Sequence, residues 1–130
     1  MLSTLGLGIA SGVGLHLLAA FATLFFLLVL WLGERVGAVV SRGGRPDLAG
    51  DVLPLVESPT LLIVGGADGL VIELNKEAFA SLRCKKEMKI IPGATHLFEE
   101  PGALEQVARL AAEWFKEHLQ AQPRASAASG

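Results

Sequence analysis

The first 33 residues of this 130-residue chain contain no lysine, arginine, aspartate or glutamate. All 11 basic and 13 acidic residues lie from Glu34 onward. In that stretch they make up about a quarter of the sequence, as in an ordinary soluble domain. An uncharged apolar head therefore precedes a globular sequence, and the total length allows one domain rather than two.

Other groups are also scarce, and each scarcity excludes a class of protein. One cysteine excludes an internal disulfide framework and any site built from several cysteine ligands. The net charge of −2 argues against nucleic acid as a partner, because nucleic-acid-binding surfaces are basic. The three histidines lack metal-ligand spacing, and no dinucleotide-binding or phosphate-binding loop motif is present. We therefore expect no metal and no cofactor.

The apolar head contains a continuous hydrophobic run over Val13–Leu32. A membrane-spanning helix needs about 20 such residues. No basic residue precedes the run and no small-residue cleavage site follows it, which argues against a cleavable signal peptide. Residues 1–33 are therefore predicted to form a single-pass transmembrane segment with membrane lipid as partner. Three arginines follow the run: Arg35, Arg42 and Arg45. Because basic residues favour the cytoplasmic side of a membrane, we expect the C-terminal domain to lie in the cytoplasm.

Two routes to self-association follow from the sequence. Gly8 and Gly12 form a GxxxG pair, which can let two spanning helices approach closely, although simple glycine flexibility at a helix start is the favoured explanation. An unpaired strand at the edge of a sheet is the second route.

The globular part, residues 34–119, alternates short apolar runs with segments of helical periodicity. The runs at 36–40, 60–64 and 86–91 predict three strands, and 71–82 and 99–119 predict two helices. Continuous apolar strands separated by helices indicate a parallel α/β sheet. Three strands and two helices are typical of one end of a larger doubly wound sheet. The low-complexity tail, 120–130, is expected to be disordered.

Two polar residues follow predicted strands. Asp68 comes after the strand at 60–64, and His96 comes after the strand at 86–91. Ligands and catalytic groups of doubly wound sheets gather at this edge. A carboxylate there can orient an imidazole, and the imidazole can then act as general base for a nucleophile. The alternatives are that Asp68 forms a turn and that His96 is an ordinary loop or capping histidine.

Residues 35–119 resemble the C-terminal part of an α/β-hydrolase of the dienelactone-hydrolase-like group. The resemblance rests on three segments: Val-Val-Ser-Arg-Gly-Gly-Arg-Pro-Asp at 39–47, Pro-Thr-Leu-Leu-Ile-Val-Gly-Gly-Ala-Asp at 59–68, and Pro-Gly-Ala-Thr-His-Leu-Phe at 92–98. It implies a hydrolase of ester or acyl bonds in which Asp68 is the triad acid and His96 the triad histidine. The order of acid before histidine agrees with this group.

The sequence does not show the part of such a hydrolase that carries the nucleophile. Upstream of the first strand, Ser11 stands where the family has a G-x-S-x-G elbow, but its flanking motif positions are Ile9 and Val13. Ser41, Ser58 and Cys84 lack an elbow pattern altogether or lie far from the strand ends. The oxyanion-hole donors would be lost with the same half.

Three hypotheses remain open. The chain could be a serine hydrolase with Ser11 as nucleophile. It could be a membrane-anchored binding or interaction module without catalysis. It could also be a truncated hydrolase that is inactive alone, and this last reading is the one we favour from the sequence. The substrate is not predicted.

Overall fold

The computed structural model describes residues 13–119. Three strands, β1 (Val39–Arg42), β2 (Thr60–Gly65) and β3 (Lys86–Ile91), form one sheet in that order, and all pairs are parallel. The helical elements are α2 (Val13–Leu32), the 3-10 segments η1 (Gly33–Arg35) and η2 (Pro46–Leu55), α3 (Gly69–Ser81) and α4 (Ala103–Leu119). The predicted three-stranded parallel α/β architecture is confirmed.

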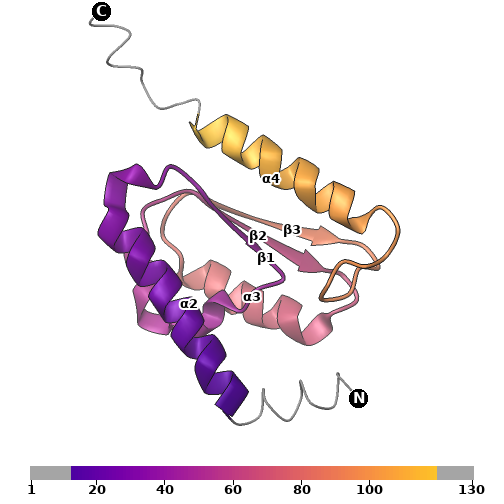
Figure 1. The fold of residues 1–130 in the computed structure, drawn as a ribbon, viewed down its shortest axis with the longest axis horizontal. Helices are drawn as coiled ribbons and strands as arrows, with labels where there is room; N and C mark the ends of the chain where they lie inside the picture. The colour runs from indigo at the N-terminus through magenta and orange to yellow at the C-terminus, as the bar shows by residue number, and fades with distance from the viewer. Residues whose placement is uncertain (1–12, 120–130) are drawn as a thin grey trace, which may run out of the picture.

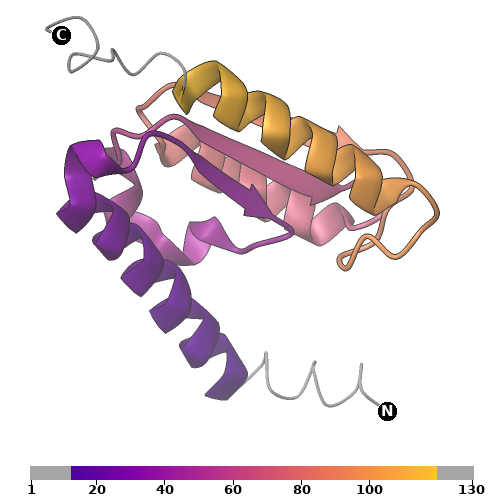
Figure 2. The same ribbon diagram turned by 45° about the horizontal axis from the view of Figure 1, so that its top comes forward.

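The sheet lies between two helical layers. Figures 1 and 2 show α4 over one face of the sheet and α2, η2 and α3 on the other side. The central strand β2 is buried along its whole length, because helices cover both of its faces. Its side chains alternate between the layers: Leu61 and Ile63 pack under α4, whereas Leu62 packs toward α2 and α3. This explains the unbroken apolar run in the sequence.

Helix α4 docks on the sheet through an apolar stripe at helical spacing. Ala103, Val107 and Trp114 are buried together with Phe98 and residues of β2 and β3. The indole of Trp114 also donates a hydrogen bond to the carbonyl oxygen of Pro59, at 3.3 Å. The helix is thereby fixed at the end of the sheet where the strands begin.

The run predicted to span a membrane forms a helix, α2, but the span itself is not supported. None of the helices within the described residues is long and apolar enough to cross a membrane. Instead, one side of α2 packs on the domain: Phe26 and Val29 are buried beside Leu53 and Val56. The opposite side leaves Phe21, Leu24, Leu28 and other large apolar side chains exposed.

Several boundaries differ from the prediction. The first strand begins at Val39 rather than at residue 36, because pairing with β2 starts only at Thr60, after a proline that has no N–H to donate. It ends at Arg42 rather than at residue 40, and α4 begins at Ala103 rather than at residue 99. Residues 46–55, between the first two strands, form the kinked 3-10 segment η2, with Gly50 at φ 49°.

Some sequence predictions fall outside the described residues. They concern Ser11 as nucleophile, the Gly8 and Gly12 pair, and the tail at 120–130.

Candidate functional site

Asp68 and His96 lie together at the carboxyl edge of the sheet, as their positions after β2 and β3 predicted. The Nδ1 atom of His96 is 3.7 Å from Oδ2 of Asp68. The carboxylate side chain is 25% exposed and the imidazole 56% exposed. At this distance the two groups form a charge pair when the imidazole is protonated, and a small movement would bring them within hydrogen-bond range.

The two loops that carry this pair are joined through the backbone. The N–H groups of Gly66 and Ala67 donate to the carbonyl oxygens of Ile91 and Ala94, at 2.8 and 2.9 Å. Gly65 allows this contact, because a Cβ at that position would lie 2.4 Å from the carbonyl oxygen of Ala94. The absence of a side chain at Gly65 is therefore what lets the Asp68 loop meet the His96 loop.

The loop after β1 completes the edge. Gly43 has φ +60°, and a Cβ there would lie 2.9 Å from the carbonyl oxygen of His96. The buried side chain of Asn75, on α3, donates from Nδ2 to the carbonyl oxygen of Gly44 at 3.2 Å. All three strand-end loops thus pack around His96.

A second contact closes the His96 loop on itself. Thr95 donates to the carboxylate of Glu100 from its backbone N–H, at 2.9 Å, and from its hydroxyl, at 2.8 Å. These two hydrogen bonds hold the pKa of Glu100 below its ordinary value of 4.5. Glu100 therefore holds the loop beside His96 in place.

The arrangement can supply a general base, but residues 13–119 place no attacking group in hydrogen-bond contact with it. Asp68 faces Nδ1 of His96, which leaves Nε2 to accept a proton from a hydroxyl. In residues 13–119, no hydrogen bond joins His96 to a serine or a cysteine. Ser58 donates to the carbonyl oxygen of Val36 at 2.8 Å, and Cys84 contacts Thr60, both at the opposite edge of the sheet.

Ser41 falls one residue beyond the strand predicted at 36–40. It lies within β1, opposite Leu62. None of the serines in the described part of the chain sits on a strand–turn–helix elbow.

Three residues that shape the site escaped the sequence interpretation: Gly43, Gly65 and Asn75. The two glycines were noted as parts of turns, but nothing in their spacing shows which backbone they approach. Asn75 stands at a helical position that gives no signal of burial. Its burial in a helix is the kind of exception that marks a structural hydrogen bond.

Comparison with known proteins gives one structural and two sequence matches, and no family model matches the chain. The crystal structure of dienelactone hydrolase from Anabaena variabilis superimposes with a TM-score of 0.70 and 56% sequence identity. The match covers 72% of this chain and 43% of that enzyme. It confirms the resemblance expected from the three sequence segments.

Two Mycobacterium tuberculosis proteins, from strains H37Rv and CDC 1551, are each 65% identical over 85 residues. Their names assign them provisionally as phosphoribosyl transferases. The match covers 65% of this chain and 19% of each relative, so the chain spans about a fifth of their length. The matched part of this chain is therefore similar in fold to dienelactone hydrolase, an α/β-hydrolase.

Proposed function

We propose that Asp68 and His96 are the acid and base of a hydrolase site for ester or lactone bonds, and that this chain does not turn over substrate alone. The observation that carries the proposal is the 3.7 Å approach of the two side chains at the carboxyl edge of the sheet. The edge is where α/β sheets bind ligands. Dienelactone hydrolase, named for a lactone substrate, supplies the substrate class.

The proposed inactivity of the isolated chain rests on what surrounds His96. A histidine base without a positioned nucleophile and oxyanion donors lacks the main sources of rate in acyl transfer. We expect no stoichiometric labelling by a fluorophosphonate probe. Slow cleavage of nitrophenyl acetate should fall in His96→Ala and survive Asp68→Asn, as free-imidazole chemistry does. Labelling of one serine, lost in both variants, would show an active triad, and Ser11 would be the first serine to map.

A chimera tests whether the pair itself is competent. The matched part of the Anabaena enzyme is replaced by the corresponding residues of this chain. The rest of that enzyme then supplies the nucleophile and the oxyanion donors. We expect lactone hydrolysis that falls by about 10⁴ in Asp68→Asn, as when a triad loses its carboxylate. His118→Gln, a histidine substitution at the other edge, is the matched control and should retain activity. A chimera that folds but shows no dependence on Asp68 or His96 contradicts the proposal.

The transferase name of the two mycobacterial relatives does not favour a second function here. Those names describe proteins of which this chain matches 19%. The glycine-rich turn at 65–69 carries the acid of the pair and lacks phosphate-loop spacing. The membrane-anchored module considered from the sequence also has less support, because it depended on the predicted span.

A further inference from the structure

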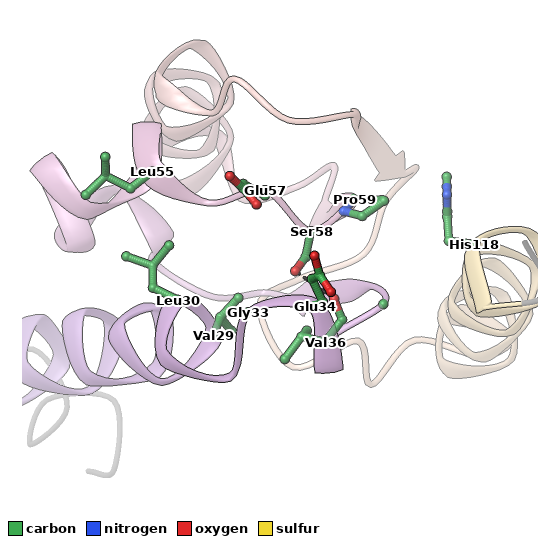
Figure 3. Close-up of a pocket in the computed structure, with 11 residues that line it drawn as sticks. Val29, Leu30, Gly33, Glu34, Val36, Leu55, Glu57, Ser58, Pro59 and His118 are labelled. Atoms are coloured by element: carbon green, nitrogen blue, oxygen red, sulfur yellow. Dashed lines mark hydrogen bonds between the residues drawn. The ribbon is translucent and has the colours of Figure 1, made fainter. Parts of the chain in front are cut away.

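A cavity of about 710 Å³ opens at the amino edge of the sheet, opposite Asp68 and His96. Its size is within the range of small-molecule sites, about 300–1,000 Å³. It lies among the end of α2, the segments that lead into β1 and β2, and the end of α4. Figure 3 shows these walls, with Leu30 on α2, Leu55 and Glu57 across from it, and His118 on the end of α4.

The walls combine apolar surface with negative charge. Val29, Leu30 and Leu55 give an aliphatic lining, and Glu34 and Glu57 add two carboxylates. No lysine or arginine lines the cavity. The carboxyl ends of α2 and α4 both border the cavity, and helix carboxyl ends carry partial negative charge. The site therefore favours a cation over a neutral molecule or an anion.

His118 provides an unused polar atom in the same place. Its side chain is 7% exposed, yet its Nε2 has no hydrogen-bond partner. The nearest carboxylate oxygen, on Glu117, is 3.9 Å away, too far for a hydrogen bond. Buried polar atoms are normally paired, because leaving one unpaired costs stability. The atom is shielded from solvent, so the imidazole contributes to the cavity as part of its wall.

The cavity is held open by contacts that do not involve its charged groups. Ser58 donates to the carbonyl oxygen of Val36, and Val39 and Trp114 both donate to that of Pro59. The ring of Trp114 also packs on that of His118, with centroids 4.1 Å apart. The walls are thus fixed, and the two carboxylates remain free to bind.

We propose that this cavity binds an organic ammonium ion with an aliphatic body. The ammonium would lie near the carboxylates of Glu34 and Glu57, while the aliphatic part would pack on Val29 and Leu30. A metal ion fits the residues less well, since the described part of the chain contains no group of three or more histidine, cysteine or acidic side chains that could hold one. The site is separate from the Asp68–His96 pair and does not rest on the hydrolase proposal.

The test uses Trp114 as a local reporter. The chain has two tryptophans, and Trp31 is 80% exposed and outside the cavity lining. In a full-length Trp31→Phe variant, the emission of Trp114 is followed during titration with hexylamine at pH 7, where the amine is protonated. 1-Hexanol and hexanoate have the same aliphatic body without the positive charge. We expect saturable binding of hexylamine, and binding at least about tenfold weaker for both controls, a difference of one charge-assisted hydrogen bond.

Glutamine variants then test whether the two carboxylates of the cavity bind the ammonium. Glu34→Gln and Glu57→Gln should each weaken hexylamine binding by about three- to tenfold, because each removes one exposed carboxylate. Glu113→Gln, an exposed carboxylate on α4 outside the cavity, should leave binding unchanged. Both glutamates are exposed, so these variants do not threaten folding. Equal binding of hexanol and hexylamine, unchanged binding in both glutamine variants, or no change in emission would each overturn the proposal.

Discussion

At the scale of single residues, the candidate site depends on a position that carries no chemistry. A Cβ added at Gly65 would lie 2.4 Å from the carbonyl oxygen of Ala94 and 2.7 Å from that of Thr95, both too close for van der Waals contact. Because backbone atoms cannot rotate away as a side chain can, an added methyl group must push the loops apart. The separation of Asp68 and His96 is therefore set by the absence of a side chain at Gly65.

Gly65→Ala should destabilise the domain by about 1–3 kcal/mol, the range for overpacking a close contact. In the chimera with the Anabaena enzyme it should also lower hydrolysis, because the acid moves away from the histidine. Urea unfolding and lactone turnover measure the two effects. Gly69→Ala is the matched control, since a Cβ there meets nothing within 4 Å. Equal stability and turnover in the two alanine variants would show that the loops do not depend on Gly65.

The sequence predicted which two polar residues meet at the candidate site better than it predicted the residues that position them. Asp68 and His96 follow buried strands, and parallel topology alone brings such positions to one edge. Gly65, Gly43 and Asn75 act through contacts with residues 29 to 53 positions away in the chain. Such contacts exist only once the strands are in register, so a local pattern cannot reveal them.

At the scale of elements, the packing of α2 on the domain could not be predicted from its hydrophobicity. The helix is apolar on all sides, so its sequence has no stripe that marks a face for packing. In the structure one side is buried against η2, while Phe21 remains 74% exposed. The amphipathic helix α4, by contrast, has a clear apolar stripe, and Val107 and Trp114 on it are buried against the sheet.

The docking of α2 on the domain can be tested with two phenylalanines on the same helix. Phe26→Ala should lower the free energy of unfolding by about 3–5 kcal/mol, because it empties a core position. Phe21→Ala should change it by less than about 0.5 kcal/mol, as exposed substitutions do. Denaturant unfolding of the full chain measures both. If the two variants are equally stable, α2 is not packed on the domain as described.

At the scale of the whole molecule, the two outer strands differ in how they resist association. β3 is buried only at Ile91 and carries Lys86, Glu87 and Lys89, charges that discourage pairing with another strand. β1 has a single charge, Arg42, at its end. Within the described residues no strand pairs with the outer side of β1. The open edge expected from the sequence is therefore chiefly that of β1.

The outward-facing donors of β1 can be identified from its pairing. Val39 and Gly43 direct their N–H groups to Pro59 and Ile63. Since the backbone alternates with a period of two, the N–H groups of Val40 and Arg42 point away from β2. Arg42→Pro would remove one outward-facing backbone N–H and leave the β1–β2 hydrogen bonds intact. An edge strand tolerates such a proline.

We therefore expect the full chain to self-associate through β1 and Arg42→Pro to weaken that association by about tenfold, because strand addition depends on the unpaired backbone groups of the edge. Arg42→Ala is the matched control: it removes the same side chain, including its approach to the Phe98 ring at 5.9 Å, but keeps the N–H. Sedimentation at several protein concentrations gives the association constant of each. If Arg42→Pro associates as strongly as Arg42→Ala, the contact uses another surface, and the exposed apolar side of α2 becomes the one to substitute next.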